Sequence, residues 1–430
     1  MTVLIVGAGA AGLTVARTLA RREIPFRVYS HANRIDRGLG IWGRAQAVLR
    51  ELGHGELLDR ERRIPAAAYR SRDGVWLSRC TDTPTNRARV TTMRESSLLS
   101  ALESSLPAGS VVRGAEVVGV ELEVDGARVR FADGSAAEGS CVVGADGVAS
   151  MVRACAFRGS TAAIDTDLVS YGGLLLPPSP GALDALLESM REGSLGGGPL
   201  AFETLSAGRR FACVPLANGA LFWFATLPSK SSQVGGAWDA ATAIGALRDA
   251  YGDWHEPIPR VLHAAACAVA EAAAASDDAA VAAALRWEPV LAAPTLERWA
   301  CGRAVLVGDA AHGMPINLAQ GAAAAVEGGY LLGEALACNR SGRGGVATAA
   351  ELEETFAAYQ AQHEPRVRQC RVATAFTAAL AAPSSALTES IRNGMRLVPQ
   401  PLNGRIFDLA LAVSLGDVPY STRKRWPLAA

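Results

Sequence analysis

The sequence predicts an α/β fold, with a Rossmann-like domain, an inserted antiparallel-sheet domain and C-terminal helices. The chain opens with the apolar, β-branched run Val3–Val6, a Gly-x-Gly-x-x-Gly motif and a helical stretch from Thr14 to Arg22. Another buried strand lies late in the chain, within Gly302–His312. Strand-like stretches rich in aromatic residues occupy 166–290, between the N-terminal motif and this late strand. Parallel strands that are covered on both faces are continuously apolar, as the first and last of these runs are.

The glycines of the motif have separate roles in a dinucleotide-binding turn. Gly7 permits the tight turn, Gly9 lets a pyrophosphate approach the backbone, and Gly12 lets the helix pack closely on the strand. The free N–H groups and the dipole at the helix N-terminus, around Ala10 and Ala11, favour a negatively charged diphosphate. The motif follows a strand and opens a helix, and therefore predicts a bound dinucleotide.

The second strand, Phe26–Tyr29, lies at the expected distance from the first. An Asp or Glu normally ends this strand and binds the adenosine ribose. This chain has Ser30 and then His31 instead. Ser30 can still hydrogen-bond a ribose hydroxyl, but it lacks the charge that repels a 2′-phosphate.

Composition excludes several classes of partner. The chain of 430 residues is long enough for two or three domains, and its 42 basic and 42 acidic side chains balance. A formal net charge of zero gives no electrostatic reason to expect nucleic acid or an acidic membrane surface. Eight scattered cysteines without a Cys-x-x-Cys pair argue against a metal site or a disulfide framework. With no cationic leader and no apolar run of membrane length, we expect a cytoplasmic protein.

Periodicity and turn residues predict the remaining elements. We expect helices at Ile41–Gly53 and Met93–Leu106, a hairpin around Asp73-Gly74, and a small antiparallel meander formed by Glu116–Glu123, Ala127–Phe131 and Ser140–Gly144. Further strands are expected at 168–176, 200–205, 209–216 and 220–226, a Gly-rich loop at Gly193–Gly198, and helices at about 236–251, 259–285, 319–338 and 350–380. We expect residues 384–430 to form a partly helical tail that is interrupted by prolines.

Three stretches together carry a family resemblance. They are the Gly7/Gly9/Gly12 turn, the Gly144-Ala145-Asp146-Gly147 stretch with Ser150 and Arg153, and the Gly308-Asp309-Ala310-Ala311-His312 stretch with Pro315 and Gly321. Their order and spacing resemble the class A flavoprotein monooxygenases, which have the para-hydroxybenzoate hydroxylase-like fold. The resemblance covers about residues 1–165 and 290–375, and does not extend through 166–290.

The resemblance implies a bound FAD and assigns residues to it. Gly7, Gly9 and Gly12 would hold the diphosphate, Asp309 would bind a ribityl hydroxyl, and the loop through Pro315 would lie beside the isoalloxazine. The helix from Ala319 would point its positive end at the N1–C2 carbonyl edge, where reduced flavin is negative. The full set of expected cofactor residues is Gly7, Gly9, Ala10, Ala11, Gly12, Ser30, His31, Arg44, Arg94, Asp146, Gly147, Gly308, Asp309, Pro315, Gly321 and Ala322.

The chain departs from the family pattern at three places. Ser30 replaces the ribose acid, Glu327-Gly328-Gly329 stands where Glu-Asp-Ala is frequent, and Leu318-Ala319-Gln320-Gly321 stands where Gly-Gln-Gly is frequent. The last two concern details of flavin contact rather than the family itself. We interpret His312 as structural, because the chemistry of this family belongs mainly to the flavin. His263 is assigned no role.

The implied activity is monooxygenation of an aromatic or polycyclic small molecule. NADPH or NADH would reduce FAD, and a flavin C4a-hydroperoxide formed with O₂ would hydroxylate or epoxidise the substrate. An Arg- and Ala-rich composition suggests a role in secondary metabolism. Catalytic side chains stay unassigned, with Tyr171, Arg210 and Trp223 as pocket candidates on the predicted sheet strands. We expect no metal, and a monomer or homodimer.

Three alternatives share the flavin fold. A flavin-dependent halogenase needs a relay Lys near a Trp-x-Trp-x-Ile-Pro motif, but the motif is absent and no Lys precedes Lys230. A reductase of a prenyl-type lipid would saturate double bonds without using O₂. An FAD-binding protein without turnover would bind the cofactor but show no substrate-stimulated NAD(P)H oxidation.

The expected domains are discontinuous. Residues 1–75, 92–165 and 290–375 would form the FAD-binding domain, and 76–91 with 166–289 the substrate-binding domain. Residues 376–430 would form a C-terminal helical tail.

Overall fold

The structure is a computed structural model. It describes residues 2–31, 36–64, 68–80, 90–157, 159, 162–190, 201–229, 239–317, 319–341, 347–381, 386–399, 402–406 and 408. None of the helices in these ranges is long and apolar enough to cross a lipid bilayer.

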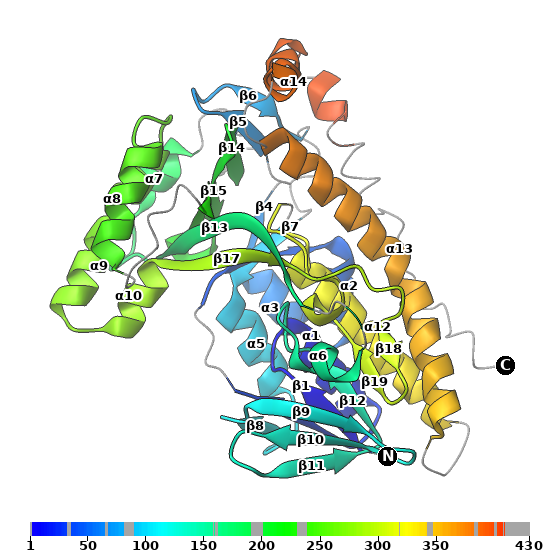
Figure 1. Ribbon diagram of the computed structural model, residues 1–430. Helices are drawn as coiled ribbons and strands as arrows, with labels where there is room; N and C mark the ends of the chain where they lie inside the picture. The colour runs from blue at the N-terminus through cyan, green and yellow to red at the C-terminus, as the bar shows by residue number, and fades with distance from the viewer. Residues whose placement is uncertain are drawn as a thin grey trace.

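A six-stranded, mostly parallel sheet forms the centre of the cofactor-binding half (Figure 1). The first strand, β1 (Val3–Val6), is buried along its whole length and pairs in parallel with both of its neighbours. The strand order is β18 (Ala300–Cys301), β19 (Ala304–Leu306), β12 (Cys141–Gly144), β1, β2 (Phe26–Ser30) and β8 (Val111–Arg113). Burial on both faces explains why these strands are continuously apolar.

Helices pack on this sheet and on each other. The helix that follows β1, α1 (Ala10–Arg21), lies against α12 (Gly321–Ser341), where small residues let the two backbones approach. A Cβ at Gly333 would lie 2.5 Å from the Thr18 Cβ, so only glycine fits there. The long α13 (Ala349–Ala381) packs on α12 and runs along one side of the molecule (Figure 1). The other helices of this half are α2 (Gly43–Glu51), α3 (Gly55–Arg60), α5 (Glu95–Ser104), α6 (Met151–Ala156) and α11 (Asp309–His312).

Two small antiparallel sheets complete this half. One is a meander of β9 (Val117–Leu122), β10 (Ala127–Phe131) and β11 (Ala136–Gly139). Its first two strands were predicted, but the third predicted strand, Ser140–Gly144, is wrong for this sheet, because it contains β12 of the six-stranded sheet. The other contains β3 (Gly38–Trp42), β7 (Val90–Arg94) and β4 (Arg62–Ile64).

A seven-stranded sheet forms the other half. Its order is β17 (Arg286–Ala292), β13 (Ile164–Leu175), β16 (Leu221–Pro228), β15 (Arg209–Pro215), β14 (Phe202–Ser206), β5 (Ala68–Ser71) and β6 (Trp76–Ser78). One face packs on helices to form a second hydrophobic core, in which the rings of Phe211 and Trp223 stack with centroids 5.6 Å apart. The helices near this sheet are α7 (Asp184–Ser189), α8 (Ala240–Tyr251), α9 (Ile258–Ala274) and α10 (Asp278–Ala284), and α14 (Ala386–Leu397) lies beside β6.

Element types agree with the sequence predictions more closely than element bounds do. The predicted helix at Ile41–Gly53 begins only at Gly43, because Ile41 and Trp42 belong to β3 and pair with β7. Similarly, β7 extends to Arg94, so the helix predicted from Met93 begins at Glu95. The strand β5, which we grouped with residues 1–75, pairs with β14 in the seven-stranded sheet. The predicted loop Gly193–Gly198 lies outside the described residues.

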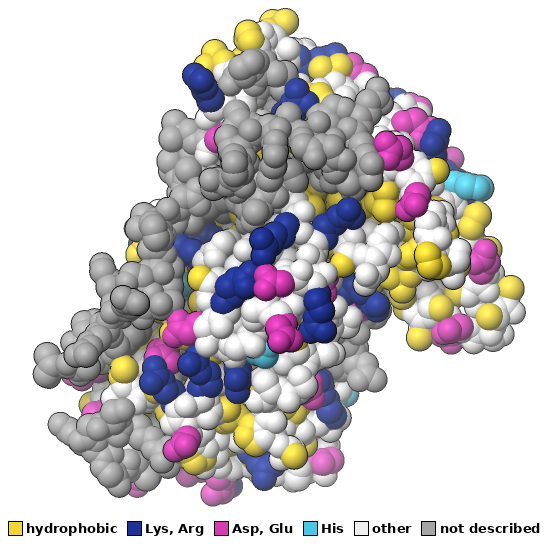
Figure 2. All heavy atoms as spheres, turned by 180° about the vertical axis from the view of Figure 1, so that it is seen from behind, with side chains coloured by type: hydrophobic (Ala, Val, Ile, Leu, Met, Phe, Trp, Pro, Cys, Tyr) yellow, Lys and Arg dark blue, Asp and Glu magenta, His cyan; other side chains and the backbone are white. Residues whose placement is uncertain are grey.

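The surface carries both signs of charge. Figure 2 shows basic and acidic side chains interspersed on the face turned away from Figure 1. This mixture agrees with the zero formal net charge of the chain.

Candidate functional site

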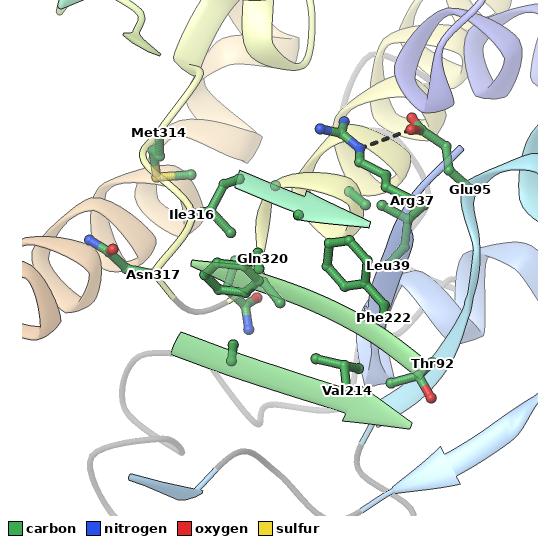
Figure 3. Close-up of a pocket in the computed structure, with 18 of the residues that line it drawn as sticks. Arg37, Leu39, Thr92, Glu95, Val214, Phe222, Met314, Ile316, Asn317 and Gln320 are labelled. Carbon is green, nitrogen blue, oxygen red and sulfur yellow. Dashed lines mark hydrogen bonds and ion pairs between the residues drawn. The ribbon is translucent and has the colours of Figure 1, made fainter. Parts of the chain in front are cut away.

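One cavity lies between the two halves of the molecule (Figure 3). Its walls come from the N-terminus of α1, from β3, from the loop 314–320 and the start of α12, and from the seven-stranded sheet. Eight of the predicted cofactor residues line it: Gly9, Ala10, Ala11, Gly147, Asp309, Pro315, Gly321 and Ala322. Residues predicted from three separate stretches of sequence therefore meet at one place.

The N-terminus of α1 is open to an anion. Gly9 precedes the helix with extended backbone, no side chain caps the helix, and its first turn contains no acidic residue. Gly7 has φ +108°, and a Cβ there would lie 2.2 Å from the Ala145 carbonyl oxygen. A Cβ on Gly12 would lie 2.0 Å from the Gly7 oxygen. The glycines thus hold strand and helix together and leave the N–H groups facing the cavity.

The second helix that begins at the cavity, α12, also has no acidic residue in its first turn. Asp309 is exposed at the cavity, and its Oδ1 lies 4.0 Å from the position of a Cβ on Gly321. Gly147 has φ +81° with open space around its Cβ position. Two helix N-termini without acidic residues in their first turns, an exposed carboxylate and a glycine with free space fit a dinucleotide that has a diphosphate, a polyol chain and a polar ring edge.

Comparisons with known proteins agree with this geometry. A family model described as "FAD binding domain" matches residues 1–168 and 262–370. The 3-amino-4-hydroxybenzoate 2-monooxygenase of Streptomyces cremeus is 31% identical over 76% of this chain and 76% of its own. The 2-heptyl-3-hydroxy-4(1H)-quinolone synthase of Pseudomonas aeruginosa (strain UCBPP-PA14) is 28% identical over 94% of this chain and 96% of its own. The structure of Klebsiella pneumoniae HpxO with FAD and uric acid superposes with TM-score 0.74, at 22% identity, over 96% of this chain and 97% of that one.

The chain belongs to the class A FAD-dependent monooxygenases. In this family, bound FAD takes hydride from NAD(P)H and activates O₂ for transfer of one oxygen atom to the substrate. The fold class and the FAD cofactor predicted from the sequence are confirmed.

Other predicted cofactor residues of this monooxygenase lie outside the cavity lining. Asp146 is a structural acceptor: its Oδ1 accepts from the Ser150 hydroxyl at 2.5 Å and its Oδ2 from the Val152 N–H at 3.0 Å, and burial raises its pKa. Gly308 has φ +62° and touches α1, because a Cβ there would lie 2.8 Å from the Ala11 Cβ. The buried Arg153 donates to the Ala310 oxygen at 2.8 Å and so joins the second sequence stretch to the third.

The two arginines predicted near FAD have partners of their own. Arg94 Nε donates to Asp36 Oδ2 at 2.6 Å, and Arg94 does not line the cavity. Arg44 lines a separate, smaller cavity with Glu327, His363 and Arg366. Ser30 ends β2 and His31 follows it, and neither residue lines the main cavity; His31 Nε2 lies 4.0 Å from Glu116 Oε2.

The histidines do not line the cavity. His312 is fully buried between Trp299 and His363, with ring centroids 5.3 and 5.2 Å away, and burial lowers its pKa to about 3. This surrounding agrees with a structural role. His263 is exposed on α9, with its Nε2 3.8 Å from the Cys267 Sγ.

The three pocket candidates have different positions. Tyr171 and Trp223 point into the core on the far face of the sheet, whereas Gly172 and Phe222, their neighbours in sequence, line the cavity. We therefore do not retain Tyr171 and Trp223 as pocket residues, because successive strand residues face opposite sides. Arg210 stands directly behind the lining and forms a buried ion pair with Glu203, which does line the cavity.

Sequence reasoning missed the polar groups at the two ends of the cavity. At one end Arg37 Nε lies 2.8 Å from Glu95 Oε2 (Figure 3). Arg286 and Glu288 also line the cavity and interact electrostatically with Arg37. Burial alone would lower the pKa of Arg37, but Glu95, Glu288 and Asp309 raise it. At the other end are Glu203 and Asn317, the latter on the opposite side of the view in Figure 3. The lining between the ends is mostly apolar and includes Leu39, Val90, Ala212, Val214, Phe222 and Phe224.

Proposed function

We propose that this monooxygenase acts on a neutral, flat aromatic heterocycle that carries an aliphatic substituent. The substituent and ring would contact the apolar middle of the cavity, where Phe222 and Phe224 offer aromatic faces. Burying an aromatic ring and an alkyl chain there gains about 25 cal/mol for each Å² of apolar surface removed from water.

A cytoplasmic location, a role in secondary metabolism and a monomeric or homodimeric state stay predictions from the sequence.

The observation that carries the proposal is the charge of the lining. Among the described lining residues, four carboxylates (Glu95, Glu203, Glu288 and Asp309) face two guanidinium groups (Arg37 and Arg286). Arg37 is paired with Glu95, and Arg286 donates to the Asp36 backbone oxygen at 3.0 Å. An aromatic carboxylate buried here would need an unopposed cation. A neutral heterocycle would not.

The quinolone named in the Pseudomonas relative belongs to this class of molecule, whereas the aminohydroxybenzoate named in the Streptomyces relative is an anion.

The test is substrate-stimulated NAD(P)H oxidation by the FAD-loaded enzyme. It compares 2-heptyl-4(1H)-quinolone, which lacks only the 3-hydroxyl of the compound in the former name, with 3-amino-4-hydroxybenzoate. We expect the quinolone to stimulate oxidation and yield a hydroxylated product, and the benzoate to do neither. Preference for the benzoate would contradict the proposal.

A further inference from the structure

Glu203 is a carboxylate at the cavity, and it lies on β14 of the seven-stranded sheet. Its side chain is 8% exposed, and it lines the cavity from β14. Phe202 belongs to the second hydrophobic core and also touches the cavity, and the Thr204 hydroxyl lies 2.8 Å from His255 Nε2. Glu203 pairs with Ala212 of β15, which lines the cavity. Because directly opposite residues of neighbouring strands lie on the same face of a sheet, this pairing directs Glu203 toward the cavity.

The arginine beside Glu203 uses all three of its guanidinium nitrogens in hydrogen bonds within the protein. Arg210 Nε donates to Glu203 Oε1, Nη1 donates to Asn317 Oδ1, and Nη2 donates to the Ile316 carbonyl oxygen at 2.6 Å. The Asn317 amide nitrogen in turn donates to the Thr374 carbonyl oxygen at 2.9 Å. Each nitrogen of the guanidinium therefore has an acceptor. Among the described residues that line this end of the cavity, none offers a cation to an anionic ligand.

The carboxylate itself keeps accepting capacity. Within the described part of the chain, Arg210 donates to Oε1, which leaves Oε2 at the cavity. A carboxylate only accepts hydrogen bonds, and one that is buried gains most from a donor that points at its free oxygen. Burial raises the pKa of Glu203, and the adjacent Arg210 opposes that shift.

We propose that Glu203 selects substrates that present a ring N–H or O–H donor, which it binds through Oε2. This inference rests on the proposed function and adds to it which edge of the heterocycle is recognised. Arg210 has a positioning role, because it fixes the carboxylate and joins it to the cavity-lining residues Ile316 and Asn317. A ligand without the donor would leave the buried oxygen unpaired and would bind more weakly.

The test compares two probes that differ only at the donor. These are 2-heptyl-4(1H)-quinolone and its N-methyl counterpart, assayed for binding by flavin fluorescence and for kcat/KM with FAD-loaded enzyme. We expect the wild-type enzyme to favour the N–H compound by about 10- to 100-fold, as a hydrogen bond to a charged acceptor implies. In E203Q, Arg210 still requires the side-chain oxygen, so the amide NH₂ faces the cavity. The discrimination should then fall to near one.

The matched control is E327Q, which alters another buried Glu–Arg pair, Glu327 Oε2 with Arg366 Nε at 3.3 Å, outside the main cavity. It should lose comparable stability and keep the wild-type discrimination. Thermal unfolding and FAD content establish that both variants fold. If the wild-type enzyme accepts both probes equally, or if E203Q discriminates as the wild type does, the role of Glu203 is refuted while the proposed function stands. If neither probe binds, the proposed function fails and this inference fails with it.

Discussion

At the residue scale, Arg210 links the two halves of the site. It lies on β15 of the seven-stranded sheet, yet it bonds to Asn317 and to the Ile316 oxygen in the loop that leads to α12. Met314, Pro315 and Asn317 of that loop line the cavity (Figure 3). Together with the packing of Ile316 on the sheet, this planar guanidinium group fixes the loop relative to the sheet, and a lysine ammonium cannot reproduce its several donors.

We predict that Arg210→Lys uncouples NAD(P)H oxidation from product formation. Lysine can keep a charge beside Glu203, but it loses the hydrogen bonds to Asn317 and Ile316 in the loop. The substrate would then be oriented less accurately relative to the flavin. Product formed per NAD(P)H consumed, measured with 2-heptyl-4(1H)-quinolone, should fall several-fold.

The control for this change is Arg209→Lys on the same strand. Arg209 Nη1 donates to the Ala250 oxygen at 3.1 Å and does not line the cavity. In Arg209→Lys, the amount of product formed per NAD(P)H consumed should match that of the wild-type enzyme. If Arg210→Lys forms as much product per NAD(P)H as the wild-type enzyme, Arg210 does not position the loop.

The predicted site residues that the structure brings together are those with a local sequence signal, and their contact with FAD stays a prediction. Gly9, Ala10, Ala11, Asp309 and Gly321 were predicted from short motifs, and all of them line the cavity. A helix N-terminus and its glycines lie within a few residues of each other, so the chemistry can be read from the sequence. By contrast, Arg37 pairs with Glu95 at a separation of 58 residues, and Arg210 bonds to Asn317 at a separation of 107. No local pattern indicates such pairs.

At the element scale, α12 explains a departure from the family pattern. Gly328 and Gly329 follow Glu327, where Asp-Ala is frequent. A Cβ on Gly328 would lie 2.8 Å from His363 Nε2, and one on Gly329 would lie 2.7 Å from the Ala11 oxygen. The glycines make room for α13 on one side and for α1 on the other. The helix is thereby fixed at the place where its N-terminus meets the cavity.

We predict that Gly328→Ala destabilises the protein by about 1–3 kcal/mol, the usual cost of overpacking a filled core. Gly245→Ala in α8 is the matched control, because nothing lies within 4 Å of its Cβ position. There the helix preference of alanine should stabilise by about 0.5–1 kcal/mol. Chemical denaturation with FAD present measures both. Equal effects at the two positions would contradict the packing explanation.

The faces of the seven-stranded sheet could not be assigned from the sequence. Both faces of β16 carry aromatic residues, with Phe222 and Phe224 at the cavity and Trp223 in the core. Alternation separates the two sets but does not tell which face is covered by helices, because neither face is polar. The sequence therefore places Tyr171 and Trp223 on sheet strands but does not tell whether they or their neighbours face the cavity. The bounds of β3 were missed because Ile41 and Trp42 suit a helix start equally well.

At the scale of the whole molecule, the cofactor half and the sheet half close around one cavity. The sequence motifs lie in the cofactor half, and both halves contribute to the apolar middle and to the charged ends of the cavity. The surface is mixed in charge, so neutral substrates would approach without electrostatic steering. Water exclusion would then depend on how well the substrate fills the apolar middle.

The most direct test of this function is the origin of the oxygen atom in the product. The FAD-loaded enzyme is supplied with NAD(P)H and 2-heptyl-4(1H)-quinolone under ¹⁸O₂, and the product is analysed by mass spectrometry, with a parallel reaction in H₂¹⁸O. A monooxygenase should place one ¹⁸O atom from O₂ in each product molecule, and none from water. NAD(P)H consumption that yields a reduced substrate, or a product without ¹⁸O from O₂, would contradict monooxygenation and favour a flavin-dependent reductase.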